Sequence, residues 1–195
     1  IARLLGAQGY GLYNLSLTAI TMVSILATIG LDVAFMRFVA ILKGKKDEAG
    51  IWGTIQIGLG TSAILSILAG FLFYILAEPI AIQIFDEPQL VPLLQLSSFF
   101  IPFAALGNVL TTGIRGFKMM QYSVIPQNIV KPLIKLFLIA LLTLAIGLDT
   151  TGALITFGLS EIIALILVLY FLNKIFSLRR PLNEADRKTK NIFGF

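Results

Sequence analysis

The chain has 195 residues, of which 57% are hydrophobic and only 13% are charged. Soluble domains contain about 45–50% apolar residues, so this composition indicates a protein whose surface lies largely in lipid. The net charge of +5 does not indicate nucleic-acid binding, because the basic residues lie between apolar runs and form no single patch. The lack of Cys and His excludes disulfides, thiolate chemistry, zinc sites and imidazole catalysis. We expect no cofactor, no metal site, no catalytic residue and no nucleic-acid partner.

Five apolar runs predict transmembrane helices. A helix needs about 20 apolar residues to cross the hydrocarbon core, which is about 30 Å thick. Three runs are long enough and contain no charged residue, namely 4–31, 49–77 and 88–114. Two further runs, 124–147 and 152–173, contain only Lys131 and Lys135 in the first and Glu161 in the second. The sequence therefore predicts an all-α fold, a polytopic transmembrane helix bundle with five complete spans.

The predicted bundle occupies residues 1–176, and a connector is expected to follow it. The predicted spans cover about residues 10–31, 51–76, 90–113, 124–147 and 152–173. Residues 177–195 mix both charges and include Pro181, so we expect a cytoplasmic connector and the start of a next span. Because the chain begins at Ile1 and its last residues resemble the first turn of another span, we expect it to be an internal piece of a longer protein.

The basic residues predict the orientation in the membrane. Lys and Arg in short loops stay on the cytoplasmic side of a membrane. Loops 37–48, 115–122 and 174–190 hold twelve basic residues, whereas the alternate loops 78–89 and 147–152 hold none and carry four acids. We therefore expect a multi-pass protein of the cell membrane with the first three of these loops in the cytoplasm.

The second predicted span carries a stripe of small residues. Gly58, Ser62, Ser66 and Gly70 recur every four residues and share one helix face. Small residues let membrane helices approach closely, so we expect another helix to pack there. This stripe indicates packing and not transport.

Polar residues mark the first and third predicted spans. Asp32 follows a polar face at the cytoplasmic end of the first span, where it either pairs with a neighbouring helix or lies at the membrane interface. Both interpretations stay open. Asn108 lies on a polar face of the third span, and Arg115 closes the cytoplasmic end of that span.

The fourth predicted span contains two costly lysines. Lys131 and Lys135 lie four residues apart on one face, and Asn128 lies three residues before Lys131. At 1.5 Å per residue from Val124, Lys135 is roughly 16 Å deep, near the bilayer centre. A lysine there costs about 2.5–3.5 kcal/mol even on the insertion scale, so it is expected to face protein or water.

Glu161 in the fifth predicted span lies at a similar depth to Lys135. Two interpretations stay open. Either Lys135 pairs with Glu161, or the lysines line a water-filled cavity in which they meet an anionic substrate. Glu161 and Asp32 are the candidates for an ion pair or for coupling to an ion.

Three segments carry a resemblance to a known family. They are ARLLGAQGYGLYNL at the start, GLDVAFMRFVAILKGKKDEAG between the first two spans, and GNVLTTGIRGFKMMQYSVIPQNIVKPLIK later in the chain. These segments resemble the N-terminal half of the prokaryotic polysaccharide biosynthesis flippases, in the multidrug, oligosaccharidyl-lipid and polysaccharide exporter superfamily. The resemblance covers nearly the whole chain and rests on glycines, an arginine and basic loops.

The resemblance implies a transporter of two helix bundles, of which this chain would hold helices two to six of the first. It implies a lipid-linked saccharide as substrate, whose diphosphate and sugars pass through a cationic cavity while the tail stays in membrane lipid. The missing C-terminal half of the same chain would complete the path. The residues that we expect to contact substrate are Arg37, Asn108, Arg115, Asn128, Lys131 and Lys135.

The sequence leaves two other classes of function to weigh. A cation-coupled exporter of drugs or other small molecules from the same superfamily is the alternative, and it would need acids inside the membrane where this chain has lysines. A membrane enzyme would need a carboxylate cluster or metal ligands at one face, and the sequence shows no such spacing. We therefore expect a flippase and not an enzyme.

Overall fold

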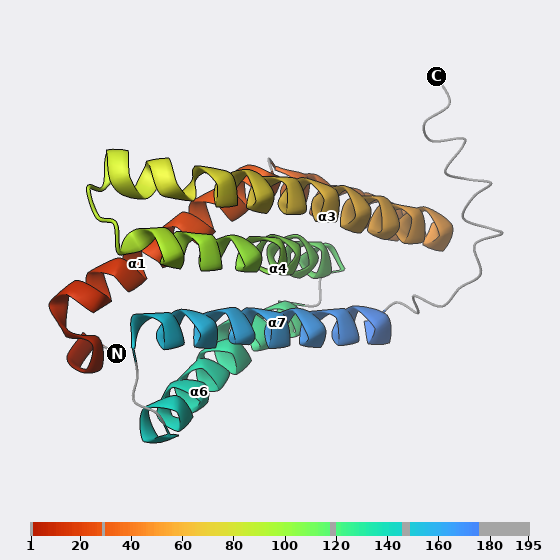
Figure 1. Ribbon diagram of the computed structural model, residues 1–195. Helices are drawn as coiled ribbons and strands as arrows, with labels where there is room; N and C mark the ends of the chain where they lie inside the picture. The colour runs from red at the N-terminus through yellow and green to blue at the C-terminus, as the bar shows by residue number, and fades with distance from the viewer. Residues whose placement is uncertain (1, 29, 118–119, 146–148, 176–195) are drawn as a thin grey trace.

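The computed structural model describes the chain except residues 1, 29, 118–119, 146–148 and 176–195 (Figure 1). All regular elements in the described part are helices. They are α1 (Ala2–Thr28), α2 (Leu31–Gly44), α3 (Glu48–Pro79), η1 (Ile80–Ile84), α4 (Leu90–Gly116), α5 (Met120–Val124), η2 (Ile125–Val130), α6 (Lys131–Ala145) and α7 (Thr150–Ile175). The predicted connector over residues 177–195 lies outside the described residues.

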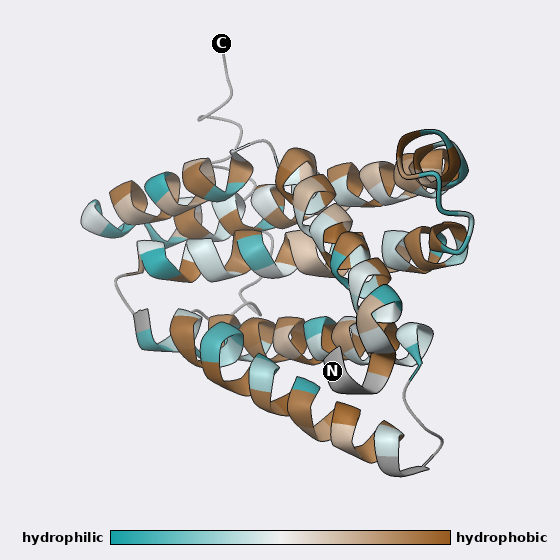
Figure 2. Cartoon of the chain, turned by 90° about the vertical axis from the view of Figure 1, so that its left-hand side faces the viewer, coloured by the Kyte–Doolittle hydropathy of each residue, from teal (hydrophilic) through white to brown (hydrophobic). Residues whose placement is uncertain are grey.

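Five of the described helical segments are long and apolar enough to cross a membrane. They are Leu5–Thr28, Glu48–Ile84, Leu90–Gly116, Gln121–Thr143 and Thr150–Lys174. Hydrophobic residues dominate along all of these helices, and hydrophilic positions are few (Figure 2). The predicted fold class, an all-α transmembrane bundle, is confirmed.

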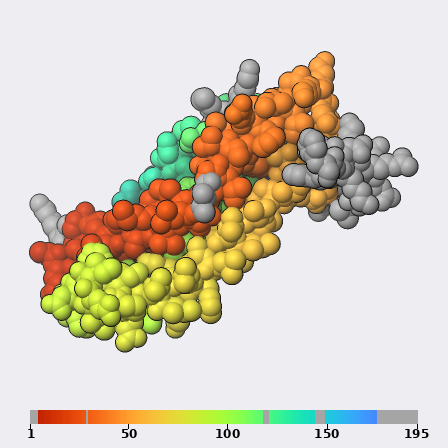
Figure 3. Space-filling view, turned by 90° about the horizontal axis from the view of Figure 1, so that it is seen from above, coloured from red at the N-terminus to blue at the C-terminus, as the bar shows by residue number. Residues whose placement is uncertain are grey.

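Helix α4 lies at the centre of the bundle and packs against α1, α2, α3 and α7 (Figure 1). Two buried apolar clusters follow one another along it. The first cluster includes Ile20, Phe73, Ile101 and Leu154. The second includes Phe35, Ile55, Val109 and Leu165. The first cluster takes side chains from α1, α3, η1, α4 and α7, and the second from α2, α3, α4 and α7, so α4 fixes the positions of its neighbours. Viewed from above, the α1–α2 segment (red to orange) lies beside α3 (gold to yellow) (Figure 3).

Small residues allow this close packing. A Cβ atom on Gly70 would lie 2.9 Å from the backbone oxygen of Ser98 on α4, and one on Gly58 would lie 2.9 Å from the Phe35 ring of α2. Ser62 and Ser66 between them are buried. The stripe on α3 therefore packs against α4 and α2, as predicted.

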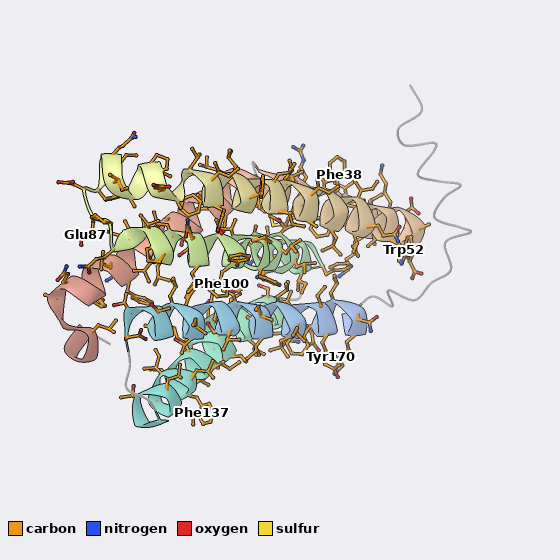
Figure 4. The ribbon with its side chains drawn as sticks, viewed as in Figure 1. Phe38, Trp52, Glu87, Phe100, Phe137 and Tyr170 are labelled. Carbon is orange, nitrogen blue, oxygen red and sulfur yellow. The ribbon has the colours of Figure 1, made fainter. Side chains whose placement is uncertain are left out.

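A second close approach joins α4 to α7. The ring of Phe100 lies between these two helices (Figure 4). It occupies the space that a Cβ atom on Gly158 would need. Glycine at this position therefore sets the distance between the two helices.

The prediction of a loop over residues 37–48 is wrong for residues 37–44. These residues form the second half of α2. Gly30 adopts φ 76° and separates α2 from α1. Phe35 and Val39, four residues apart, are buried on one face of α2. The sequence does not reveal this amphipathic helix, because basic residues between two apolar runs also predict a loop.

Helix α6 is preceded by the π-helical turn η2, in which Pro126 is buried. Proline cannot donate to the helical ladder, and π-helical turns accommodate such interruptions at the cost of a wider turn. From this point α6 diverges from α7 towards its C-terminal end (Figure 1). The two helices are therefore closest near the start of α6.

Candidate functional site

The lysines of α6 and one acid of α7 form the charged cluster of the bundle. The Nζ atom of Lys131 lies 2.5 Å from Oε1 of Glu161, which is a salt bridge between α6 and α7. Glu161 is buried, and Lys131 is partly buried. Of the two interpretations that the sequence left open, the structure does not show the pair between Lys135 and Glu161, because Glu161 pairs with Lys131. Because α6 diverges from α7 beyond its start, the earlier lysine is the one that reaches the carboxylate.

Lys135 turns towards two aromatic rings. Its Nζ atom lies 5.3 Å from the centre of the Tyr13 ring on α1 and 5.5 Å from the centre of the Phe157 ring on α7. The Nζ atom of Lys131 lies 5.6 Å from the same Phe157 ring. Ring faces attract cations, most strongly where water is excluded. The ammonium group of Lys135 therefore points towards α1 and α7, and that of Lys131 points towards α7.

Tyr13 adds a buried hydroxyl group to the surroundings of Lys135. The Tyr13 side chain is only 2% exposed, and its hydroxyl oxygen has no hydrogen-bond partner. Together Lys131, Lys135 and Tyr13 offer seven donor hydrogens in their ordinary protonation states, whereas Glu161 supplies the carboxylate of this group. The arrangement has more donors than acceptors, which suits an anion.

Gln127 is a residue that the sequence analysis missed. Its Nε2 atom donates to Oγ1 of Thr111 on α4, at 3.2 Å. Gln127, Lys131 and Lys135 are spaced four residues apart and all turn inward, whereas the predicted Asn128 is exposed. The four-residue spacing was the available signal. The contact with α4 itself depends on how the helices pack, which this spacing does not give.

A polar cleft of about 320 Å³ lies next to this face. It is formed where α1 ends, α2 begins, and α4 and η2 face each other. Its lining residues are Ile25, Thr28, Gly30, Asp32, Asn108, Thr111, Thr112, Arg115 and Gln127. The cleft therefore brings together three of the residues proposed from sequence, Asp32, Asn108 and Arg115.

The remaining predicted residues are placed differently. Arg37 is exposed on α2 and is not among the residues that line the cleft. Arg115 is also exposed, but its Nε atom donates to Oγ of Ser123 on α5, at 3.2 Å. Asp32 is half-buried and lines the cleft. Gln127 belongs to the cleft and shares the lysine face, so it links the two parts of the site.

Comparison with known proteins places the chain in a family. All residues, 1–195, match the family described as polysaccharide biosynthesis protein. The chain is similar to Stage V sporulation protein B of Bacillus subtilis (strain 168), with 24% identity over 201 residues that include 99% of this chain and 38% of that protein. The chain thus spans well under half the length of this relative. No solved structure matches it. Because the family match covers every residue and five described helices are able to cross a membrane, the chain is a multi-pass membrane protein that belongs to the polysaccharide biosynthesis protein family.

Proposed function

We propose that the chain is part of a flippase that moves a lipid-linked oligosaccharide, a polyprenyl diphosphate saccharide, across the cell membrane by alternating access. This step would serve the synthesis of cell-surface polysaccharide, and it is transport and not catalysis. The family match over residues 1–195 supports a role in polysaccharide biosynthesis. Membrane lipid and a C-terminal half of the same chain are the proposed partners, and nucleic acid is not one. The segments 37–48, 115–122 and 174–190, of which residues 37–44 are helical, are proposed to face the cytoplasm.

The depth of the charged cluster is the observation that carries this proposal. Helix α7 has 26 residues, and Glu161 is the twelfth of them. At 1.5 Å per residue the helix is about 39 Å long, so Glu161 lies near its middle. The ion pair fixes Lys131 at the same level. Ionisable groups at this depth of a membrane bundle are costly and mark the path of a substrate or ion.

The sign of the cluster indicates the substrate. Lys131 and Lys135 face one carboxylate, which Lys131 already binds. A second anion is needed to neutralise Lys135, and lysine ammonium groups bind phosphate oxygens well. An exporter of cationic drugs would need the opposite balance of charge. The diphosphate of a lipid-linked saccharide therefore fits better than a cation.

The test uses the full-length protein in proteoliposomes. A fluorescent short-chain polyprenyl diphosphate saccharide is the probe, and the rate at which it crosses the bilayer is measured. We expect Lys135→Gln and Lys131→Gln each to lower the rate at least tenfold, because each removes a charge from the phosphate contact. Lys45→Gln, which changes an exposed lysine at the end of α2, is the matched control and should transport normally.

Folding has to be checked separately from transport. Each variant should elute as a single symmetric species in size-exclusion chromatography, with a melting temperature measured in the same detergent. If both lysine variants fold and still transport the probe at the wild-type rate, the lysines do not contact the substrate and the proposal fails.

A further inference from the structure

The cleft and the lysine cluster differ in chemistry. Seven of the nine residues that line the cleft are polar, and the two charged ones, Asp32 and Arg115, have opposite signs. The structure shows no salt bridge between them. The cleft is therefore close to neutral overall, whereas the lysine cluster has an excess positive charge. A phosphate group favours the cluster, and the cleft suits a neutral polar ligand.

The free hydrogen-bonding groups of the cleft include both donors and acceptors. Gln127 uses an N–H bond towards Thr111 and keeps its carbonyl oxygen and its other N–H. Arg115 uses Nε towards Ser123 and keeps the N–H groups at the end of its side chain. Asn108 adds an exposed amide, and Asp32 adds carboxylate oxygens. A sugar hydroxyl both donates and accepts, so it can pair with each of these groups.

The position of the cleft matches the order of groups in the proposed substrate. Gln127 lines the cleft and lies about one helical turn before Lys131 on the same face. A ligand group beside Gln127 therefore lies about one helical turn from Lys131 and about two turns from Lys135. At about 320 Å³ the cleft is at the lower end of the roughly 300–1,000 Å³ typical of small-molecule sites, which is room for a sugar unit and not for a long oligosaccharide.

We propose that this cleft binds the sugar unit attached to the diphosphate, with Asp32, Asn108, Arg115 and Gln127 contacting its hydroxyl groups. This inference rests on the proposed function, in which the lysines hold the diphosphate. Arg115 then contacts the sugar, whereas the lysines contact the diphosphate. The cleft also gives Asp32 a role in recognition.

The test compares probes with and without a sugar on the full-length protein in detergent. The probes are farnesyl diphosphate and the same molecule carrying glucose, galactose or N-acetylglucosamine, and their dissociation constants are measured by calorimetry. We expect at least one glycosylated probe to bind wild-type protein about tenfold more tightly than farnesyl diphosphate, a gain of the size that well-placed hydrogen bonds supply.

Variants then separate the two subsites. Asp32→Ala and Asn108→Ala should remove the advantage of the glycosylated probe and leave the affinity for farnesyl diphosphate within twofold of wild type. Lys135→Gln should weaken both kinds of probe. Gln56→Ala, which removes an exposed amide from α3 outside the cleft, is the control and should change neither affinity.

The outcomes distinguish the two proposals. If wild-type protein binds none of the probes, the proposed function fails and the sugar subsite fails with it. If farnesyl diphosphate binds through the lysines but no attached sugar improves its affinity, only the sugar subsite is overturned. The same holds if Asn108→Ala weakens both kinds of probe equally while the variant keeps the wild-type melting temperature.

Discussion

The ammonium group of Lys131 and the carboxylate of Glu161 meet at 2.5 Å and join the start of α6 to the middle of α7. The carboxylate is almost wholly shielded, because the Glu161 side chain is only 6% exposed. Removing a charge from water offsets much of what a buried pair gains, but removing one partner leaves the other charge uncompensated. The pair therefore fixes an arrangement of α6 and α7 more than it adds stability.

Glu161→Gln should lower stability, because Lys131 then has no carboxylate partner in a shielded position. We expect a loss of about 1–3 kcal/mol, less than for a fully buried pair because Lys131 is 24% exposed. Thermal unfolding of the full-length protein in detergent measures it. The double variant Lys131→Met with Glu161→Met should recover most of the lost melting temperature. A Glu161→Gln protein that melts with wild type would show that the pair does not hold α6 against α7.

Gly158→Ala should weaken the contact between α4 and α7. The added methyl group would collide with the ring of Phe100, and overpacking of this kind typically costs about 1–3 kcal/mol. A lowered melting temperature is the readout, and Phe100→Leu in the same protein should restore part of it. Gly60→Ala is the matched control, since nothing lies within 4 Å of an added Cβ there. Equal melting of the Gly158 and Gly60 variants would contradict this packing.

Gly30→Ala should strain the turn between α1 and α2. Gly30 has φ 76°, a left-handed conformation that costs an alanine about 1–2 kcal/mol. Gly30→Asn should cost less, because asparagine tolerates this conformation better. Gly44→Ala at the end of α2 meets open space and should not lower the melting temperature. If alanine and asparagine at position 30 behave alike, the turn is not left-handed in the membrane.

The orientation of the helices can be tested with cysteines, because this chain contains none. Single cysteines at Lys45 and Gln121 should be protected from a membrane-impermeant maleimide in intact cells and react after the cells are opened. Cysteines at Asp86 and Asp149 should react in intact cells. The full-length protein needs any cysteines outside this chain replaced first. The opposite pattern would reverse the predicted orientation, and labelling of all four positions in intact cells would contradict the predicted loops.

The fold class followed from the sequence because the apolar runs are long and the charges lie between them. The presence of helix α2 did not follow from the sequence, since its basic residues are equally typical of a loop. Phe35 and Val39 are four residues apart and buried together, which is the helical signal that was overlooked. Sequence patterns detect a span by its composition, whereas a short amphipathic helix beside a span is detected only by its periodicity.

The candidate site was predictable in its residue types and not in its contacts. Depth along a straight helix placed Lys135 and Glu161 at one level, but it gave no information on how α6 leans away from α7. The four-residue spacing puts Gln127 on the lysine face, but it does not show that Thr111 of α4 lies within reach. The cleft could not be foreseen, because Asp32 and Arg115 approach it from different helices.

The lysine cluster has consequences for how an electric field acts on this protein. The cluster has two ammonium groups and one carboxylate, which Lys131 binds, so it carries an excess positive charge. A diphosphate brings more than one negative charge and reverses that sign. A charge that moves through a voltage of 100 mV changes in energy by about 2.3 kcal/mol. In the proposed transport cycle, the voltage would therefore act in opposite directions on the protein with a bound diphosphate and on the protein without one.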